Sequence, residues 1–154
     1  MTDPDLELRA AEVGEAAAIR GVVRAAYAKW VAVIGREPVP MQADYQKALH
    51  KHQFDVGVED GQIIGLIETL QHPDYLWIEN VAVLPAAQGR GIGRLLLAHA
   101  EHKASAAGRF EVRLATNGAF AANLSLYSGL GYAVDRQEEF MNGVAVYMSK
   151  RLAR

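Results

Sequence analysis

The chain has 154 residues, of which 51% are apolar and 22% are charged, as in a soluble globular protein with a sizeable core. Its formal net charge is −2 with scattered basic residues, so nothing favours a nucleic-acid partner. It has no cysteine, which excludes disulfides, thiol catalysis and thiolate metal sites, and no apolar run is long enough to span a bilayer. Because the polar, acidic start is unlike a signal peptide, we expect a cytoplasmic protein without a membrane partner, folded as a single domain over residues 1–154.

Hydrophobic periodicity divides the chain into strands and helices. In chain order the expected elements are a strand at 6–10, helices at 15–35 and about 41–49, strands at 54–59, 62–70 and 75–83, a helix at 92–107, a strand at 111–115, a helix at 121–130, and strands at 132–140 and 144–151. Asp60-Gly61 and Asn142-Gly143 are hairpin turn signals. Hairpins mixed with strand–helix crossovers predict an α+β, mixed-sheet fold with helices on both faces, and a doubly wound parallel sheet fits poorly.

The most informative segment is the glycine-rich stretch from Val81 to Leu97, which has the sequence V-A-V-L-P-A-A-Q-G-R-G-I-G-R-L-L-L. The backbone N–H groups of such a turn, at the start of a helix, bind anions. A Walker P-loop is excluded because its G-K-[ST] ending is absent. A dinucleotide fingerprint fits poorly because Gly89, Gly91 and Gly93 alternate and lie past the middle of the chain. A pyrophosphate cradle of the acyl-coenzyme A type matches the spacing, and an ordinary loop-to-helix turn is the alternative.

This stretch resembles the acetyl-coenzyme A signature of the GNAT N-acetyltransferase superfamily, whose core Q/R-x-x-G-x-G/A is here Gln88, Gly91 and Gly93. The run N-L-S-L-Y-S-G-L-G-Y, at 123–132, resembles the superfamily's second signature at its usual separation. A recurring subgroup also carries T-N before that helix and an I-G-x-x-P-x-P-M loop near the start, which are here Thr116-Asn117 and I-G-R-E-P-V-P-M at 34–41. The resemblance implies a GNAT-like fold, with a mostly antiparallel twisted sheet of about six to seven strands and about four helices. In that fold a splayed strand pair holds the cofactor, acetyl-coenzyme A.

The resemblance also implies which residues bind this cofactor. The pantetheine arm adds like an extra strand to residues 81–83, and the turn gives N–H groups to the pyrophosphate. The implied cofactor-binding residues are Val81, Ala82, Val83, Gln88, Gly89, Arg90, Gly91, Ile92, Gly93, Arg94, Asn117 and Asn123. Many relatives carry an Asn where this chain has Phe120, so Asn117 or Asn123 is expected to replace it. The five His residues show no ligand pattern, and we expect no metal.

Acyl transfer from a thioester to an amine requires a deprotonated amine, a stabilised oxyanion and a proton for the leaving thiolate. Tyr127 matches the family position that supplies this proton. The alternative interpretations are that Tyr127 is only an aromatic wall of the site or that it only holds the sulfur. A backbone N–H near Val83 is placed to polarise the thioester carbonyl. Glu79 is the candidate base, and Glu68 is the second candidate. For each of them, the alternative interpretation is a solvent-facing strand carboxylate without a catalytic role. Regular alternation puts Glu79 on the side of Val81, and a bulge would break that parity.

We therefore expect an N-acetyltransferase that moves an acetyl group to a primary amine of a small molecule or peptide by direct attack in a ternary complex. The large side chains that are candidates for the acceptor pocket, or for ordinary core, are Tyr27, Trp30, Met41, Tyr45 and Phe140. The acidic residues that favour a cationic acceptor are Glu37, Asp44, Glu68, Glu79 and Glu138. A non-catalytic acyl-coenzyme A sensor and a nicotinamide-dependent oxidoreductase are the alternatives. A homodimer is left open.

Overall fold

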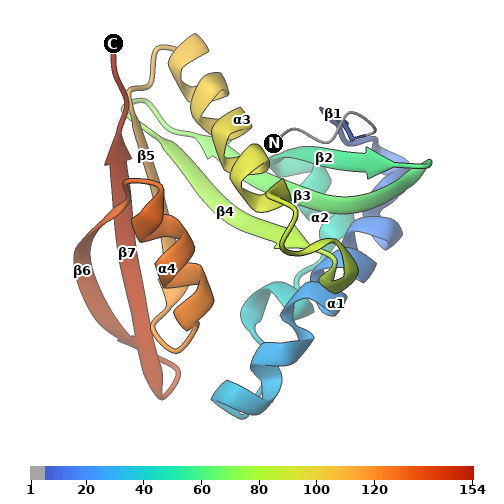
Figure 1. The fold of residues 1–154 in the computed structure, drawn as a ribbon, viewed down its shortest axis with the longest axis horizontal. Coiled ribbons are helices and arrows are strands. Elements are labelled where there is room, and N and C mark those ends of the chain that lie inside the picture. The colour runs from blue at the N-terminus through green and yellow to red at the C-terminus, as the bar shows by residue number, and fades with distance from the viewer. Residues whose placement is uncertain (1–5) are drawn as a thin grey trace.

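A computed structural model describes residues 6–154 as a mixed α/β fold built on one seven-stranded sheet (Figure 1). Its elements are β1 (Glu7–Ala10), η1 (Val13–Glu15), α1 (Ala16–Ile34), η2 (Val39–Gln42), α2 (Tyr45–Lys51), β2 (Gln53–Glu59), β3 (Gln62–Gln71), β4 (Leu76–Val83), η3 (Pro85–Ala87), α3 (Ile92–Ala106), β5 (Glu111–Asn117), α4 (Ala121–Gly129), β6 (Ala133–Phe140) and β7 (Gly143–Arg151). This confirms the predicted fold class and its numbers of strands and helices. The first five residues of the acidic start lie outside the described residues.

The sheet divides into two halves between β4 and β5. Its strand order is β1-β2-β3-β4-β5-β7-β6, and only the β4–β5 pair is parallel. That pair spans three residue pairs, from Leu76 opposite Val112 to Ile78 opposite Leu114. Beyond Ile78 the two strands diverge, so the rest of β4 has no partner on its β5 side (Figure 1). This divergence is the splayed strand pair that the resemblance implied.

A β-bulge lies in β4 at Glu79. Opposite β3, Ile78 pairs with Thr69 and Asn80 pairs with Glu68, so Glu79 is the extra residue. The bulge reverses the alternation of side chains, because Ile78 and Val81, three residues apart, belong to the same hydrophobic cluster. Of the two alternatives that the sequence left open, the structure therefore shows the bulge, which breaks the parity that regular alternation would give between Glu79 and Val81.

Each face of the sheet is covered by its own hydrophobic cluster. One cluster packs the sheet against α3 and α4. The other packs strands β2, β3 and β4 against α1 and α2. Gly65 on β3 lets α3 approach closely, since a Cβ there would lie 3.2 Å from Ile92 Cγ2 and 3.3 Å from Leu96 Cδ1. This close packing fixes the start of α3, and the glycine turn before it, against β3 and β4.

Two boundaries differ from the sequence prediction for local reasons. Helix α2 begins at Tyr45 and not at about residue 41, because Asp44 caps it by accepting a bond from the Lys47 N–H at 3.1 Å. The last hairpin turns at Met141-Asn142, one residue earlier than predicted, since Phe140 pairs directly with Gly143. Both turn residues have positive φ, 48° and 65°. Strand β6 ends at Phe140 as predicted, and β7 begins one residue earlier than predicted, at Gly143.

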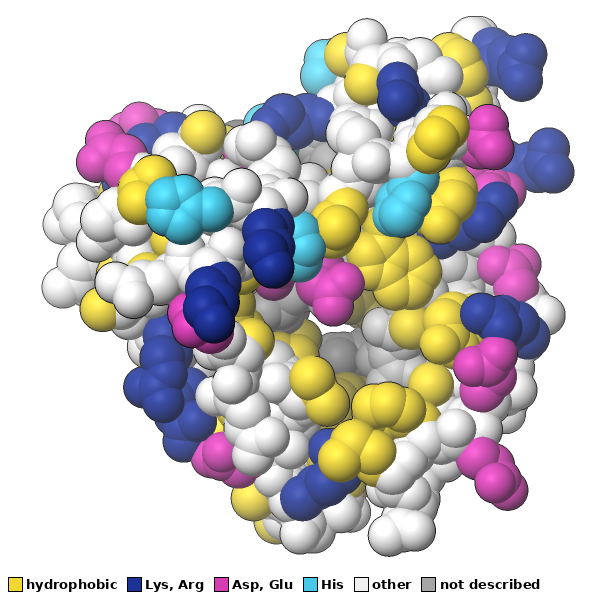
Figure 2. All heavy atoms as spheres, turned by 180° about the vertical axis from the view of Figure 1, so that it is seen from behind, with side chains coloured by type: hydrophobic (Ala, Val, Ile, Leu, Met, Phe, Trp, Pro, Cys, Tyr) yellow, Lys and Arg dark blue, Asp and Glu magenta, His cyan; other side chains and the backbone are white. Residues whose placement is uncertain are grey.

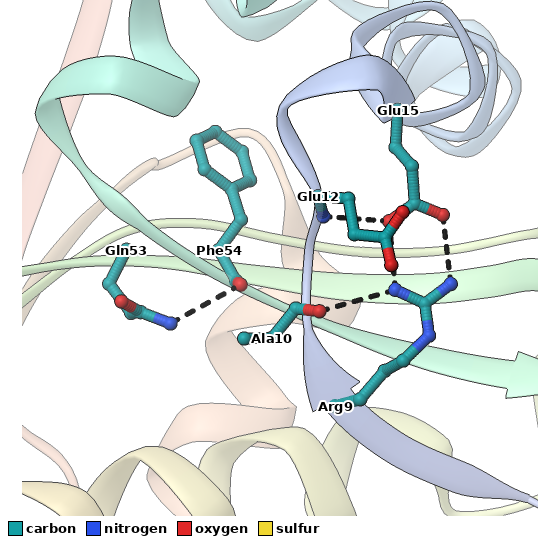
Figure 3. Close-up of polar contacts among 6 residues, drawn as sticks. All are labelled: Arg9, Ala10, Glu12, Glu15, Gln53 and Phe54. Atoms are coloured by element: carbon teal, nitrogen blue, oxygen red, sulfur yellow. Dashed lines mark hydrogen bonds and ion pairs between the residues drawn. The ribbon is translucent and has the colours of Figure 1, made fainter.

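Arg9 joins β1 to the start of α1 through Glu15 (Figure 3). Two guanidinium nitrogens of Arg9 each donate to a Glu15 carboxylate oxygen at 2.8 Å, and the Glu12 N–H donates to the same carboxylate at 2.8 Å. The hydrogen bonds from Arg9 are the main reason that the pKa of Glu15 falls to about 2. Because this pKa lies below that of the unfolded chain, Glu15 stabilises the fold above about pH 5, and this stabilisation is lost as the pH falls towards about 2.

Replacing Glu15 by Gln is expected to lower the free energy of unfolding by about 1 kcal/mol at pH 7, a modest effect because the pair is partly exposed. The difference from wild type should shrink as the pH is lowered towards about 3, which denaturant unfolding at both pH values will measure. Glu139→Gln, on the exposed strand β6, is the matched control and should change little. If Glu15→Gln lowers the free energy of unfolding by the same amount at both pH values, the ionised Glu15 carboxylate is not the source of the stabilisation.

Candidate functional site

The glycine turn places the start of α3 beside the end of β4. Gly89 and Gly91 both have φ of +82°, and Gly91 precedes the first residue of α3. Such backbone is accessible to glycine and strained for other residues. The Gln88 side chain donates to the Val83 carbonyl at 3.1 Å and accepts from Lys29 Nζ at 3.3 Å. These contacts join the turn, β4 and α1 around one space.

That space, the turn cavity, has a volume of about 390 Å³. Its lining residues are Ala26, Tyr27, Lys29, Trp30, Val81, Ala82, Val83, Ala87, Gln88, Gly89, Gly91, Ile92, Gly93, Arg94, Ala122, Asn123, Leu126 and Tyr127. Ten of the twelve predicted cofactor residues are therefore in one place. Lys29 and Arg94 add two cationic side chains to a site that already has the N-terminus of a helix.

A second cavity, the hairpin cavity, lies between the loop after α1, strands β4 and β5, α4 and the β6–β7 hairpin. It has a volume of about 230 Å³, and its lining residues are Tyr27, Ile34, Arg36, Pro38, Val39, Pro40, Ile78, Glu79, Asn80, Val81, Leu114, Ala115, Thr116, Asn117, Phe120, Asn123, Tyr127, Phe140, Val144, Ala145 and Tyr147. Figure 2 shows the face turned away in Figure 1 hollowed near its centre, with hydrophobic side chains and an acidic group around the hollow.

The two cavities meet at four residues, which line both: Tyr27, Val81, Asn123 and Tyr127. A molecule held at the glycine turn and a second molecule held beside the hairpin would therefore contact each other here. The junction lies where β4 has left β5, so the splay of the sheet creates the connection.

Tyr127 on α4 is a buried phenol at this junction. It is 7% exposed, and burial raises its pKa to about 12, so it keeps its proton at neutral pH. Its ring packs edge-on against Tyr132, with the centroids 6.0 Å apart. Its hydroxyl makes no hydrogen bond to any residue in the described part of the chain, which leaves the proton available to a bound group.

The two candidate carboxylates lie in different surroundings. Glu79 is exposed, lines the hairpin cavity, and accepts a hydrogen bond from the Trp77 indole N–H at 2.7 Å. Glu68 is buried, lies 2.5 Å from His52 Nδ1 and lines neither cavity. Burial raises the pKa of Glu68 above its ordinary value. The geometry therefore favours Glu79 over Glu68 as a group that reaches a molecule in the hairpin cavity.

A buried chain of hydrogen bonds connects the junction to the loop after α1. The Tyr27 hydroxyl donates to Asn80 Oδ1 at 2.7 Å, Asn80 Nδ2 donates to the Tyr45 hydroxyl at 3.3 Å, and that hydroxyl donates to the Pro40 carbonyl at 2.7 Å. Asn80 is 4% exposed. Sequence reasoning missed it, although an Asn within the apolar run I-E-N-V-A-V was the available signal. The chain of bonds fixes one wall of the hairpin cavity to β4.

Two predicted cofactor residues lie outside the turn cavity. Arg90 forms an ion pair with Glu59 at the β2–β3 turn. Asn117 lines the hairpin cavity, and its side-chain oxygen accepts from the Ala119 N–H at 2.9 Å. Arg94 lines the turn cavity as predicted.

The large side chains predicted as pocket walls differ in where they lie. Phe140 lines the hairpin cavity, Trp30 lines the turn cavity and Tyr27 lines both, whereas Met41 and Tyr45 are buried away from both. Phe120, at the position where the resemblance implied an Asn, stacks on Trp30 with a centroid distance of 4.5 Å. At this position an aromatic side chain therefore packs against another ring, in place of the Asn contact to the cofactor that the resemblance implied.

Within residues 6–154, no three His, Asp or Glu side chains are close enough together to hold a metal ion. No helix in the same range combines the length and the apolar character that crossing a membrane requires.

Comparisons with known proteins agree with this geometry. The model of the acetyltransferase (GNAT) family matches residues 20–132. Mycothiol acetyltransferase of Gordonia bronchialis is 44% identical over 78 residues, which are 48% of this chain and 25% of that protein, so the match spans a quarter of the relative's length. The PaiA N-acetyltransferase of Thermoplasma acidophilum, solved in complex with coenzyme A, superposes with a TM-score of 0.82 at 20% identity over 95% of this chain and 98% of that one. The ribosomal-protein-S18-alanine N-acetyltransferase of Escherichia coli gives a TM-score of 0.79 at 18% identity over 97% and 95%.

Proposed function

The chain belongs to the acetyltransferase (GNAT) family, and from that premise we propose that it transfers the acetyl group of acetyl-coenzyme A to a primary amine. The observation that carries the proposal is the junction of the turn cavity and the hairpin cavity at Tyr127. One cavity has the features of an anion site and the other is a small, mostly uncharged pocket, as a cofactor and an acceptor require. The acceptor is a small molecule or a peptide.

Acetyl-coenzyme A fits the turn cavity by its chemistry. Its pyrophosphate matches the glycine turn, where the N-terminus of α3 and the cations Lys29 and Arg94 favour negative charge. Its amide-bearing pantetheine arm matches the β5-facing edge of β4, which lacks a strand partner beyond Ile78. The structural relative from Thermoplasma acidophilum, solved with coenzyme A, supports a cofactor of this kind on this fold.

The acceptor amine attacks the thioester carbonyl carbon directly, the C–S bond breaks, and the thiolate leaves with a proton. Direct attack is supported by two cavities that open onto each other, in a chain that has no cysteine to carry the acetyl group. Tyr127 gives its proton to the sulfur; the burial that raises its pKa also makes a leaving thiolate more basic. Glu79, in the acceptor cavity, takes the proton that the amine loses, directly or through water.

Release of free thiol from acetyl-coenzyme A, measured with and without a panel of amines, tests this proposal. Thermal shifts with acetyl-coenzyme A, coenzyme A and NAD belong to the same experiment, because a ligand at a hundred times its Kd stabilises by about 2.7 kcal/mol. We expect stabilisation by both coenzymes and amine-dependent thiol release. Stabilisation without release above the hydrolysis blank would favour a sensor, and stabilisation by NAD alone would favour an oxidoreductase.

A further inference from the structure

The charges around the hairpin cavity point to the chemical class of the acceptor. Resting on the proposed function, we infer that the acceptor is a small monoamine with an apolar body and one anionic group, as in an apolar α-amino acid. Arg36 binds its anionic group, and Glu79 faces its amine. Among the residues that line this cavity, Arg36 and Glu79 are the two charged ones.

A cationic acceptor was predicted from five carboxylates, and most of them interact with protein groups outside the hairpin cavity. Four of the five have partners outside the cavity: Glu37 with Arg24 at 2.6 Å, Asp44 with the Lys47 N–H, Glu68 with His52, and Glu138 with Arg136. None of these four lines the hairpin cavity. An acceptor with two or more ammonium groups would therefore bring more positive charge into the cavity than Glu79 balances, and charge buried without a partner is costly. This argues against a polyamine or another polycationic acceptor.

Arg36 has the free capacity that an anion site needs. It lies just after the end of α1, on the loop that forms one wall of the cavity. Its Nη1 donates to the Glu37 carbonyl at 3.2 Å, and its guanidinium carbon is 6.0 Å from the centre of the Phe140 ring. Within the described residues no carboxylate pairs with Arg36, so most of its five N–H donors are available to a bound carboxylate.

The remaining walls set the size and polarity of the acceptor. Apolar side chains dominate them, among them Ile34, Val39, Phe140 and Val144. The volume of about 230 Å³ is below the range of roughly 300–1,000 Å³ of pockets for drug-sized ligands, which suits a small acceptor. A single amine, an apolar body and a single anion match the one carboxylate, the apolar walls and the one guanidinium.

Matched acceptors test the role of the anion. Thiol release is measured with leucine and phenylalanine, with their amides, with the decarboxylated amines 3-methylbutylamine and phenethylamine, and with spermidine. The amides also represent a peptide N-terminus. We expect kcat/KM for the better amino acid to exceed that of its amide and its decarboxylated amine by about 10- to 100-fold, the range of one charge-assisted bidentate contact. The α-amino pKa of an amide lies near 8, so at the same pH a larger fraction of the amide than of the amino acid is the reactive free amine. This difference favours the amide, so it cannot produce the expected preference for the amino acid.

The substitution Arg36→Gln tests the residue. It is expected to lower kcat/KM for the amino acid by about 10- to 100-fold, mainly through KM, and to leave the amides and decarboxylated amines within about twofold. Arg20→Gln is the matched control, because Arg20 is exposed on α1, the helix that ends just before Arg36, and lines neither cavity. Thermal stabilisation by coenzyme A, measured for both variants, reports that they fold.

The remaining outcomes of these measurements would contradict either the anion site at Arg36 or the proposed function itself. Equal turnover of an amino acid and its amide, a preference for spermidine, or an equal loss for all acceptors in Arg36→Gln would overturn the assignment of the anion site, while the proposed acetyltransferase would stand. No thiol release with any amine would overturn the proposed function, and this inference with it.

Discussion

Replacing Tyr127 by Phe is expected to lower kcat for acetyl transfer by about 10²- to 10³-fold, within the range that a positioned proton donor contributes. The change removes the hydroxyl and keeps the ring, so packing against Tyr132 and the shape of both cavities are retained. KM for acetyl-coenzyme A should stay within about threefold, since the phosphate contacts lie at the glycine turn. Steady-state kinetics at saturating acceptor will measure both constants.

The matched control for this change is Tyr132→Phe. Tyr132 is also a buried tyrosine, and its hydroxyl donates to Glu101 at 2.9 Å, away from both cavities. This variant should lose about 1 kcal/mol of stability through that hydrogen bond and keep kcat within about threefold. A near-normal kcat for Tyr127→Phe would instead support the alternative in which Tyr127 only lines the site or holds the sulfur.

The pKa of Tyr127 also predicts a pH profile. Because burial places this pKa at about 12, the phenol stays protonated up to about pH 10, and loss of its proton should not lower kcat below that pH. Activity should rise with pH where the acceptor amine loses its proton. A decline in kcat between about pH 7 and pH 9 that Tyr127→Phe abolishes would contradict the buried, protonated phenol.

Replacing Gly91 by Val is expected to raise the Kd for coenzyme A by about 10- to 100-fold. Gly91 has a φ of +82°, which a β-branched residue adopts only with strain, so the turn must change its backbone course. The N–H groups at the start of α3 then no longer converge, and each charge-assisted hydrogen bond lost to the pyrophosphate weakens binding by about 10-fold or more. Calorimetric titration with coenzyme A will measure the change.

Gly108 provides a matched control at the other end of the same helix. Its φ is +77°, a Cβ at either glycine would meet no heavy atom within 4 Å, and Gly108 lines neither cavity. Both Val variants should lose about 1–3 kcal/mol of stability from backbone strain, and only Gly91→Val should lose cofactor affinity. An equal loss of coenzyme A affinity in both variants would show that general destabilisation, and not the turn, determines binding.

The local parts of the fold and the site could be predicted because local chemistry determines them. Alternating and 3.6-residue periods located the strands and helices. Gly89, Gly91 and Gly93 marked the turn, in which Gly89 and Gly91 have positive φ and Gly93 already belongs to α3. The resemblance implied a site at Tyr127, two residues before the G-L-G-Y run, and the structure puts this residue at the junction of the two cavities. The roles of these residues remain predictions.

The features that sequence reasoning missed depend on partners distant in the chain. Whether a carboxylate such as Glu37 faces a pocket or a nearby Arg is decided by how α1 and its loop pack, which periodicity does not report. Asn80 became important because Tyr27 and Tyr45, 53 and 35 residues away, converge on it. The one-residue shift of the last hairpin arose because Asn142 and Gly143 both tolerate several turn positions.

The extra residue at Glu79 makes the length of β4 as important as its composition. If the strand kept all its residues and paired regularly, without the bulge, Asn80 and Val81 would exchange places, so that the amide would enter the cluster under α3 and the valine would face Tyr27 and Tyr45. The loops around the acceptor cavity have no such constraint and can gain or lose residues as acceptors change. We therefore expect relatives that use the same chemistry on other amines to vary in those loops and to keep the residue count from Ile78 to the glycine turn.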